Sequence, residues 1–512
     1  MIGRAYTAGL IGADGYEITV ECDILPGQQH VEMVGLPDAA VKEAKDRVRS
    51  ACLNSGYPFP DTGVVMNLAP AHKRKEGSAY DLAMLMSLLS SMDADGARDI
   101  GDMSFIGELS LSGEVRPVNG VLCRVLAAKE AGRRAVFVPC ENAAEAAVVD
   151  GIEVYGVPTV RKLLDHLRGI ETIEKSTFDP LSFTGDGTLC PFDFSEVRGQ
   201  ERAKRAMEVA AAGGHNILLI GPPGTGKSML AKRMPGILPP MTFEEAVEST
   251  KVHSVAGILP PNTSLLHHRP FRAPHHTATN VSLAGGGTGF VKPGEVSLAH
   301  NGVLFLDELP EYPKSVTETL RQPLEDGRIT VTRISGIVSY PSFITLVCAM
   351  NPCKCGYYGH PDKACTCTAQ SRQNYISRVS GPLMDRIDLQ IEVGALSYDE
   401  ISDTTPGESS ADIRERVIAA REFALRRFAA AGEKITCNAQ MSAGQVRKYC
   451  VPDDEGDLAL RVAYDRLHLS GRGHDRLLKV ARTIADLAGS EQILATHILE
   501  AITLRTLDRE DY

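Results

Sequence analysis

The alternation of apolar and polar side chains predicts an α+β fold for the first third of the chain. Residues 17–24 alternate between the two kinds, which is typical of a half-buried strand. Residues 37–49 carry apolar side chains at helical spacing, and residues 81–91 are apolar almost throughout. We therefore expect an amphipathic helix, a second and more deeply buried helix, and a domain that spans residues 1–170.

Short, mostly apolar runs follow in the middle of the chain. They cover residues 216–220, 303–306 and 343–350, and polar residues flank them. Such runs are expected of strands in a parallel sheet that is covered on both faces. Residues 328–339 predict a hairpin. The region 193–395 is therefore predicted to be an α/β domain with a parallel sheet.

Composition and helical periodicity define two further regions. Residues 171–192 are rich in Thr, Ser, Gly and Asp and include two prolines, which indicates a linker. Residues 409–431 and 496–507 have the apolar spacing of helices. Residues 396–512 are therefore expected to form an all-helical lid, and the whole chain is predicted to be a multidomain α/β protein.

The bulk composition narrows the class of protein. The 512 residues are 43% hydrophobic and 23% charged, which is ordinary for globular proteins. A formal net charge of −11 argues against a broadly basic surface that coats nucleic acid, but it does not exclude a local basic channel. The sequence has no run of about 18 apolar residues, so no membrane span is predicted. The first residues lack the layout of a signal peptide. The twelve cysteines, mostly scattered, suit a reducing compartment, so we expect a cytoplasmic protein without membrane partners.

A glycine-rich motif lies between the first apolar run and a predicted helix. It reads Gly, four residues, then Gly-Lys-Ser, and its strand–loop–helix context is that of a phosphate-binding loop. Backbone amides and the helix N-terminus would surround a polyphosphate. Lys227 would reach the outer phosphates, and the Ser228 hydroxyl would ligate Mg²⁺. The residues expected to bind ATP are Gly221, Pro222, Pro223, Gly224, Thr225, Gly226, Lys227 and Ser228.

Two carboxylates follow the second apolar run, at the end of a strand where open α/β sheets bind ligands. Asp307 is predicted to hold the magnesium ion, directly or through water. Glu308 is predicted to be the general base that polarises the attacking water. Together with the phosphate-binding loop, this pair predicts an ATP hydrolase.

Other segments resemble parts of AAA+ ATPases. Residues 193–200 precede a helix and the phosphate-binding loop, as does the adenine-binding segment of that class. The resemblance implies that Val197 and Gly199 lie against the base. The run 343–350 ends at Asn351, which matches the polar residue called sensor one. The resemblance implies that Asn351 helps to position the attacking water.

Two arginines are implied by the same resemblance. The motif around Arg386 is similar to the one that supplies an arginine finger to the neighbouring subunit, with Arg378 as the alternative. Arg472 lies in a segment similar to sensor two and is expected to contact the γ-phosphate in its own subunit, with Arg476 as the alternative. Basic residues on a solvated helix are the other interpretation of Arg472. A finger that acts in trans implies a ring.

The predicted hairpin ahead of sensor one, together with the motif at 269–276, resembles the magnesium-chelatase branch of AAA+ proteins. Within that branch the similarity is to the YifB/ComM family, and it covers nearly the whole chain. It implies ATP and Mg²⁺ as cofactors and a homo-oligomer, six subunits being the family expectation. His275 and His276 are adjacent on a segment that is expected to be extended, so they should point to opposite sides. A structural or interface role is favoured over metal ligation.

The first region resembles the proteolytic domain of Lon protease. The similarity is carried by residues 67–79 and 106–120. Lon chemistry needs a serine activated by a lysine, but the serine position falls on Ala79 and the lysine position on Leu122. Ser78 lies one residue away and leaves open a displaced dyad. We favour a retained fold without peptidase activity, because function depends on the site and not on the fold.

Four of the cysteines gather in fifteen positions. Two Cys-x-Cys pairs could supply the four soft ligands that Zn²⁺ prefers, although a two-residue spacer is more typical. His360 could replace one thiolate. A reduced loop without metal is the other interpretation. The candidate zinc ligands are Cys353, Cys355, Cys365 and Cys367.

Three functions fit a ring ATPase of this branch. The ComM resemblance implies a motor that drives branch migration of single-stranded or branched DNA, together with recombination proteins as partners. Arg333, at the tip of the predicted hairpin, is then the candidate contact to DNA phosphates. The Lon resemblance leaves open a protein remodeller or ATP-dependent protease. Insertion of a metal into a porphyrin, as in magnesium chelatase, is the third candidate.

Overall fold

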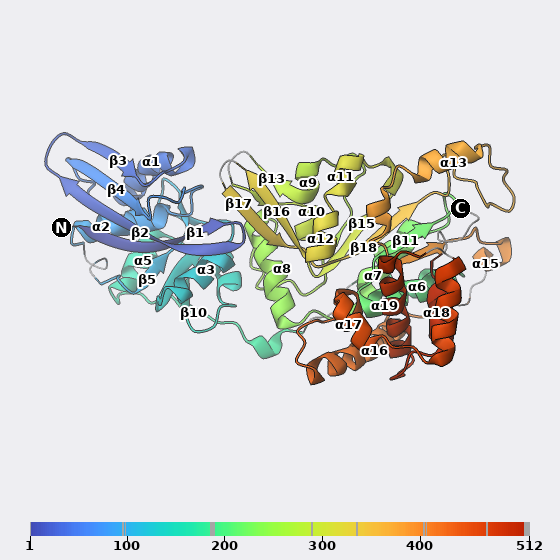
Figure 1. The fold of residues 1–512 in the computed structure, drawn as a ribbon. Helices are drawn as coiled ribbons and strands as arrows, with labels where there is room; N and C mark the ends of the chain where they lie inside the picture. Colours follow the sequence, from blue (N-terminus) through green and yellow to red (C-terminus); the bar gives the residue numbers. More distant parts are fainter. Residues whose placement is uncertain are drawn as a thin grey trace.

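The computed structural model describes residues 2–94, 97, 99–184, 190–287, 290–333, 336–402, 405, 407–466 and 469–505. Within these ranges the chain is a multidomain α/β protein, as predicted, with two large sheets and many helices. The N-terminal sheet lies at one end of the molecule, the central sheet follows it, and the C-terminal helices pack beneath the central sheet (Figure 1).

The first sheet has eight strands in the order β10-β9-β8-β5-β1-β2-β4-β3. Its long strands β1 and β2 pair antiparallel, as do β2 and β4, whereas β1, β5, β8 and β9 pair parallel to one another. The strands are β1 (Gly3–Ile11), β2 (Asp14–Leu25), β3 (His30–Val34), β4 (Gly63–Ala69), β5 (Met103–Phe105), β8 (Ala135–Pro139), β9 (Glu153–Val157) and β10 (Lys175–Ser176). The two residues of β10 come from the segment predicted as a linker and add an edge strand to this sheet.

Five helices and a small strand pair accompany this sheet. The helix at residues 81–91 has almost every side chain buried, in agreement with its apolar sequence. The elements are α1 (Ala39–Asn54), α2 (Asp81–Ser91), α3 (Val121–Glu130), α4 (Ala143–Ala146), α5 (Val160–Leu167), β6 (Glu108–Leu109) and β7 (Val115–Arg116).

The central sheet is parallel, with the strand order β12-β15-β18-β11-β19. Its strands are β11 (Ile217–Ile220), β12 (Phe271–Arg272), β15 (Gly302–Leu306), β18 (Ile344–Met350) and β19 (Leu389–Glu392). Alternate residues of β11 enter two different cores: Ile217 and Leu219 pack on one face, and Leu218 and Ile220 on the other. Both faces are covered, which explains why the strand is apolar throughout.

Helices and two small hairpins surround the central sheet. The predicted hairpin is present as β16 and β17, which pair antiparallel. The helices are α6 (Glu201–Gly213), α7 (Lys227–Ile237), α8 (Phe243–Ala256), α9 (Asn280–Ala284), α10 (Glu295–Leu298), α11 (Lys314–Glu318), α12 (Arg321–Asp326), α13 (Ala369–Ile376), α14 (Gly381–Met384) and α15 (Tyr398–Ser402). The hairpin strands are β13 (Gly285–Gly286), β14 (Lys292–Pro293), β16 (Arg328–Arg333) and β17 (Gly336–Pro341).

The C-terminal part of the described chain is helical. Apolar side chains of α16 and α19 share one core with α6 and with one face of β11. The helices are α16 (Ser410–Ala430), α17 (Ala443–Tyr449), α18 (Asp454–Arg466), α19 (Gly471–Leu487) and α20 (Ala495–Thr503). Among the described residues, no helix combines the length and the apolar character that crossing a membrane requires.

Helix α8 joins the two sheets. Apolar side chains of α3 share a core with Met241, Ala246 and Leu265 of the α8 region. The Ser254 hydroxyl donates a 2.5 Å hydrogen bond to the buried Glu145 carboxylate, and burial raises the pKa of Glu145. This polar and apolar contact holds the N-terminal region against the central one.

Candidate functional site

The phosphate-binding loop leaves the end of β11 and enters α7 at Lys227. Gly224 and Gly226 have φ angles of +84° and +88°, which glycine adopts without strain. A Cβ atom built on either would meet no atom within 4 Å, so the backbone there is open toward a ligand. The loop borders a cavity of about 380 Å³ lined by Pro223, Gly224, Thr225, Gly226, Lys227, Ser228, Met229, Asp307, Glu308, Met350 and Asn351.

Lys227 is folded back onto its own loop. Its Nζ donates to the carbonyl oxygens of Gly221 and Pro222, at 2.7 and 2.8 Å, and to Asn351 Oδ1 at 3.3 Å. Burial lowers the pKa of Lys227 to about 8, and the Asp307 carboxylate opposes that shift. A phosphate would offer this ammonium stronger, charged acceptors than the carbonyl groups it now contacts.

Two oxygen atoms suited to magnesium face each other at the mouth of the loop. Ser228 Oγ donates to Asp307 Oδ2 at 2.6 Å, although the two residues come from α7 and from the end of β15. A hydroxyl and a carboxylate are oxygen ligands of the kind that Mg²⁺ takes. The residues present therefore fit a magnesium site beside the phosphate loop.

Glu308 adopts a left-handed backbone conformation, with a φ of +54°. This conformation is uncommon for a residue other than glycine and often marks a functional position. Its side chain is about half exposed and contacts His276, with 3.1 Å between Oε2 and Nδ1. His276 was not predicted to touch the site, and its position in the motif at 269–276 was the one available signal.

The two adjacent histidines do not point to opposite sides, so that expectation was wrong. Their rings lie 4.0 Å apart. The cause is a turn at His276 and Thr277 in place of the expected extended segment. His275 Nδ1 is engaged by Thr277 Oγ1 at 2.9 Å, whereas His276 faces Glu308.

Asn351 lies at the carboxyl end of β18, between the strands that carry the phosphate loop and Asp307. Val197 and Gly199 do not line the phosphate cavity. Val197 is buried in the core beneath β11, and a Cβ on Gly199 would approach Leu396 at 2.9 Å. The structure thus brings Asn351 to the phosphate-binding loop and places Val197 and Gly199, which were expected to contact the base, outside the phosphate cavity.

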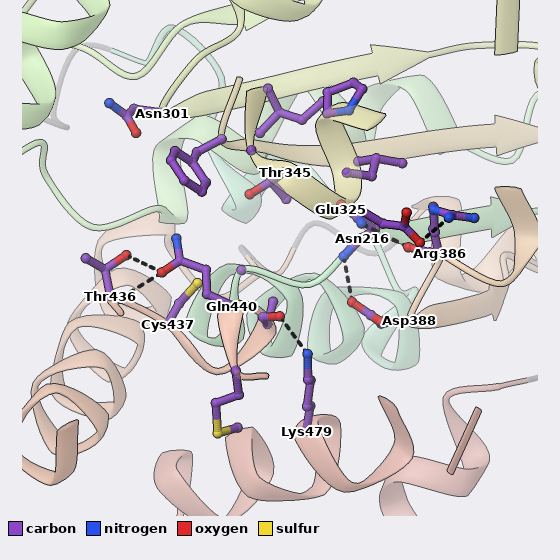
Figure 2. Close-up of a pocket in the computed structure, with 18 of the residues that line it drawn as sticks. Asn216, Asn301, Glu325, Thr345, Arg386, Asp388, Thr436, Cys437, Gln440 and Lys479 are labelled. Carbon is purple, nitrogen blue, oxygen red and sulfur yellow. Dashed lines mark hydrogen bonds and ion pairs between the residues drawn. The ribbon is translucent and has the colours of Figure 1, made fainter. Parts of the chain in front are cut away.

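Of the predicted arginines, Arg386 and Arg476 line a second cavity of about 510 Å³, where Figure 2 labels Arg386. Asn216, Asn301, Thr345 and Asp388 line this cavity, and each of them stands at or next to the amino end of a strand of the central sheet. The phosphate loop follows the carboxyl end of β11. The two cavities therefore lie at opposite ends of the strands of one sheet: the phosphate cavity at the carboxyl ends and the second cavity at the amino ends.

Arg386 and Arg472 share one carboxylate. Arg386 is buried and forms an ion pair with Glu325, and the exposed Arg472 lies 4.0 Å from the same residue. Arg476 lies 3.5 Å from Asp388 in the same region. The alternative finger, Arg378, pairs with Glu311 at 3.1 Å. None of these four arginines lines the phosphate cavity of its own chain.

The cysteine cluster is compact. The four Sγ atoms of Cys353, Cys355, Cys365 and Cys367 lie within 4.8 Å of one another. His360 is not a member of this group: its Nδ1 accepts hydrogen bonds from the backbone N–H groups of Asp362 and Lys363.

The residues at the Lon-like positions form no lysine-activated serine at the matching places. Ala79 and Leu122 are both buried, and Leu122 packs in the core next to α8. The Ser78 hydroxyl donates to the Glu108 carboxylate. The side chain of Arg333 lies outside the part of the chain that the structure describes.

A parallel sheet with an interior strand that runs through a glycine loop into a helix, and with Asp307 and Glu308 at a nearby strand end, defines a P-loop nucleoside triphosphatase. Three family models match the chain. Residues 193–401 match magnesium chelatase subunit ChlI, residues 20–142 match subunit ChlI of Mg-chelatase, and residues 407–505 match the ChlI C-terminal region.

Full-length relatives refine this class. The chain is 40% identical over 513 residues to the competence protein ComM of Haemophilus influenzae, covering 98% of this chain and 97% of the relative. It is also 40% identical over 506 residues to YifB of Escherichia coli, with the same coverage. The Lon protease of Azospirillum brasilense matches 33% of this chain, at 28% identity, over 22% of its own length. The chain belongs to the YifB/ComM family of magnesium-chelatase-like AAA+ ATPases.

Proposed function

We propose that this protein hydrolyses ATP with Mg²⁺ and uses the energy to move DNA strands through a ring of identical subunits. The observation that carries the ATPase is the convergence of Lys227, Ser228, Asp307, Glu308 and Asn351 on one cavity. A relative that is named a competence protein supports DNA as the substrate, since competence is the state in which cells take up DNA.

Each of these five residues has a role in this proposal. Lys227 leaves the loop carbonyls and binds the outer phosphates, where its charge offsets theirs. Ser228 and Asp307 would hold a magnesium ion, which would supply positive charge to neutralise the phosphates. Glu308 takes a proton from the attacking water, and Asn351 holds that water in place.

The opposite edge of the sheet serves the neighbouring subunit. Arg386 and Arg472 meet at Glu325, away from their own phosphate loop. We assign Arg386 to the phosphates bound by the adjacent subunit, with Glu325 as the partner that it leaves. Arg472 was expected to act in its own subunit, but because it lies near Glu325 and does not line its own phosphate cavity, we assign it to the adjacent subunit as well. Such a site is incomplete in one chain, and only a closed ring completes every copy of it. Six subunits are the family expectation.

The remaining parts support this motor. We assign residues 1–170 as a Lon-like scaffold without peptidase activity, residues 171–192 as a linker, residues 193–395 as the ATPase core, and residues 396–512 as the helical lid. The hairpin β16–β17 would carry Arg333 toward DNA phosphates. Arg333→Ala should slow the movement of DNA more than it slows ATP hydrolysis.

The test is the ATPase rate of the full-length protein with single-stranded DNA, branched DNA or unfolded casein, together with the movement of a labelled DNA branch. Stimulation by DNA with branch movement is expected. Glu308→Gln should lower hydrolysis about 10²-fold or more while ATP still binds. The matched control is Glu318→Gln, which removes a carboxylate on α11 that pairs with Arg321.

A protein remodeller is the second candidate, and the partial similarity to Lon protease favours it. Stimulation by casein and not by DNA would replace the motor with this function. An unchanged hydrolysis rate in Glu308→Gln would contradict Glu308 as the base, and wild-type protein that does not hydrolyse ATP would contradict the ATPase itself. A chelatase subunit, the third candidate, has no observation here beyond the family name in its favour.

A further inference from the structure

The loop between β18 and α13 carries the four clustered cysteines, and their sulfur atoms have the spacing of a metal site. Cys353 Sγ lies 3.3 Å from Cys355 Sγ and 3.7 Å from Cys365 Sγ. Cys355 Sγ lies 3.6 Å from Cys365 Sγ. A disulfide needs about 2.05 Å between sulfurs, and the cysteines of the described chain are all free.

A single tetrahedral zinc ion accounts for these distances. Four thiolates at about 2.3 Å from Zn²⁺ stand about 3.8 Å from one another. An iron–sulfur cluster is larger than one ion and would hold its thiolates farther apart. We propose that Cys353, Cys355, Cys365 and Cys367 bind one Zn²⁺, and that this ion holds the cysteine loop against the phosphate-binding loop.

Backbone amides already point at the sulfurs. The N–H of Cys367 donates to Cys365 Sγ at 3.4 Å, and the N–H groups of Tyr357 and Thr366 donate to Cys355 Sγ. Such outer partners stabilise the negative charge of metal-bound thiolates and orient them. Among the described residues the group has four sulfur ligands, which closes a structural zinc site and leaves no position for a substrate.

The cysteine loop touches the ATP site directly. Cys353 follows Asn351 by two residues, and Gly356 packs against Pro223 of the phosphate loop. A Cβ on Gly356 would lie 2.8 Å from Pro223 Cδ and 4.0 Å from Asn351 Cγ. The zinc ion would therefore hold the phosphate-binding loop and Asn351 in place through the cysteine loop. This second half of the inference rests on the proposed function.

Metal analysis of the full-length protein tests the site itself. Protein produced with zinc in the medium and purified without a metal-binding tag should contain about one zinc per chain, with four sulfur neighbours at about 2.3 Å by X-ray absorption. Cys365→Ser should lose most of the zinc, and Cys140→Ser, which changes an exposed cysteine outside the cluster, should keep it. Wild-type protein without zinc, with iron, or with disulfides among these cysteines would overturn the site.

Nucleotide binding tests the support of the phosphate loop. Wild-type protein stripped of zinc should bind a fluorescent ATP analogue about tenfold more weakly, because a small displacement of the loop misplaces its amides. Gly356→Ala should keep its zinc and lose affinity similarly, since the added Cβ pushes on Pro223 and the φ of +85° is strained for any residue other than glycine. Unchanged affinity in both would overturn the support. Wild-type protein that holds zinc but binds no ATP would overturn the proposed function and leave the zinc site standing.

Discussion

Lys227 shows how burial prepares a side chain for a charged ligand. With only carbonyl and amide oxygens around it, the ammonium has lost most of its water and gained no full counter-charge within bonding distance. Its pKa falls from 10.5 to about 8 for this reason. A bound phosphate would reverse the shift, because a nearby negative charge favours the protonated amine.

ATP binding should therefore take up protons through Lys227. At pH 8 the free protein carries this group about half protonated, and the complex carries it fully protonated, so the uptake is about half a proton. At pH 6.5 Lys227 is already protonated in both states and takes up none. Calorimetric titration in buffers of different ionisation enthalpy measures the uptake. Lys227→Arg stays charged throughout, and an equal uptake in that variant would contradict the assignment.

His276 is expected to position Glu308. The 3.1 Å contact between the imidazole and the carboxylate restrains a side chain that is otherwise half exposed. His276→Gln should lower kcat about tenfold and leave KM nearly unchanged, because the base is misplaced but ATP still binds. His275→Gln is the matched control, since His275 contacts Thr277. Equal losses in the two variants would indicate a general effect on the turn.

Local spacing made part of this site predictable, and long-range contacts made the rest unpredictable. Lys227 and Ser228 follow from one eight-residue motif, and Asp307 follows from an apolar strand that ends in carboxylates. The pairing of Glu308 with His276 depends on a turn that the dipeptide does not reveal. The Glu325 carboxylate that Arg386 and Arg472 share is also distant in sequence from both.

At the scale of elements, the C-terminal helices are held together by a buried charge network. Arg427 of α16 donates two hydrogen bonds to Asp486 of α19, at 2.8 and 2.7 Å. Arg482 and Asn438 also donate to the Asp486 carboxylate. Only 1% of the Asp486 side chain is exposed. Because water hardly reaches this carboxylate, its charge is stabilised by the Arg427 guanidinium and not by solvent.

Asp486→Ala should destabilise this helical part strongly. Removing one partner leaves buried guanidinium groups uncompensated, which costs about 3–5 kcal/mol in similar cases. Asp457→Ala is the matched control: its pair with Arg461 on α18 is exposed, with side chains 76% and 47% accessible, and should cost below about 1 kcal/mol. Urea unfolding followed by circular dichroism measures both. Similar losses would show that the network contributes little beyond a surface pair.

The apolar runs predicted the long strands well because a strand covered on both faces must be apolar. β11, β15 and β18 were all expected for this reason. The two-residue strands β10 and β12 carry no such pattern. They exist because longer neighbours present free edges to them, and a pattern within two residues cannot show that.

At the scale of the molecule, the central sheet separates the phosphate cavity from the cavity that Arg386 lines. Its carboxyl edge carries the phosphate loop, Asp307 and Asn351, and its amino edge carries Arg386. In the proposed ring, one subunit would therefore carry the halves of two different sites and no whole one. In a ring, the amino edge of each subunit would complete the site on the next.

Mixing two inactive variants should restore part of the ATPase activity. Arg386→Ala keeps Glu308 but lacks the arginine, and Glu308→Gln keeps Arg386 but lacks the base. A ring built from either variant alone therefore has no interface with both groups. In randomly mixed rings about one interface in four joins the intact Glu308 of one subunit to the intact Arg386 of the next, and activity should return to about a quarter of the wild-type rate.

Arg378→Ala, which breaks the exposed pair with Glu311, is the control that should stay active alone. Size-exclusion chromatography must show that both variants assemble, because Arg386 is buried and its loss could disturb the fold. If the variants assemble and the mixture remains inactive, Arg386 does not act across subunits, and its pair with Glu325 is structural.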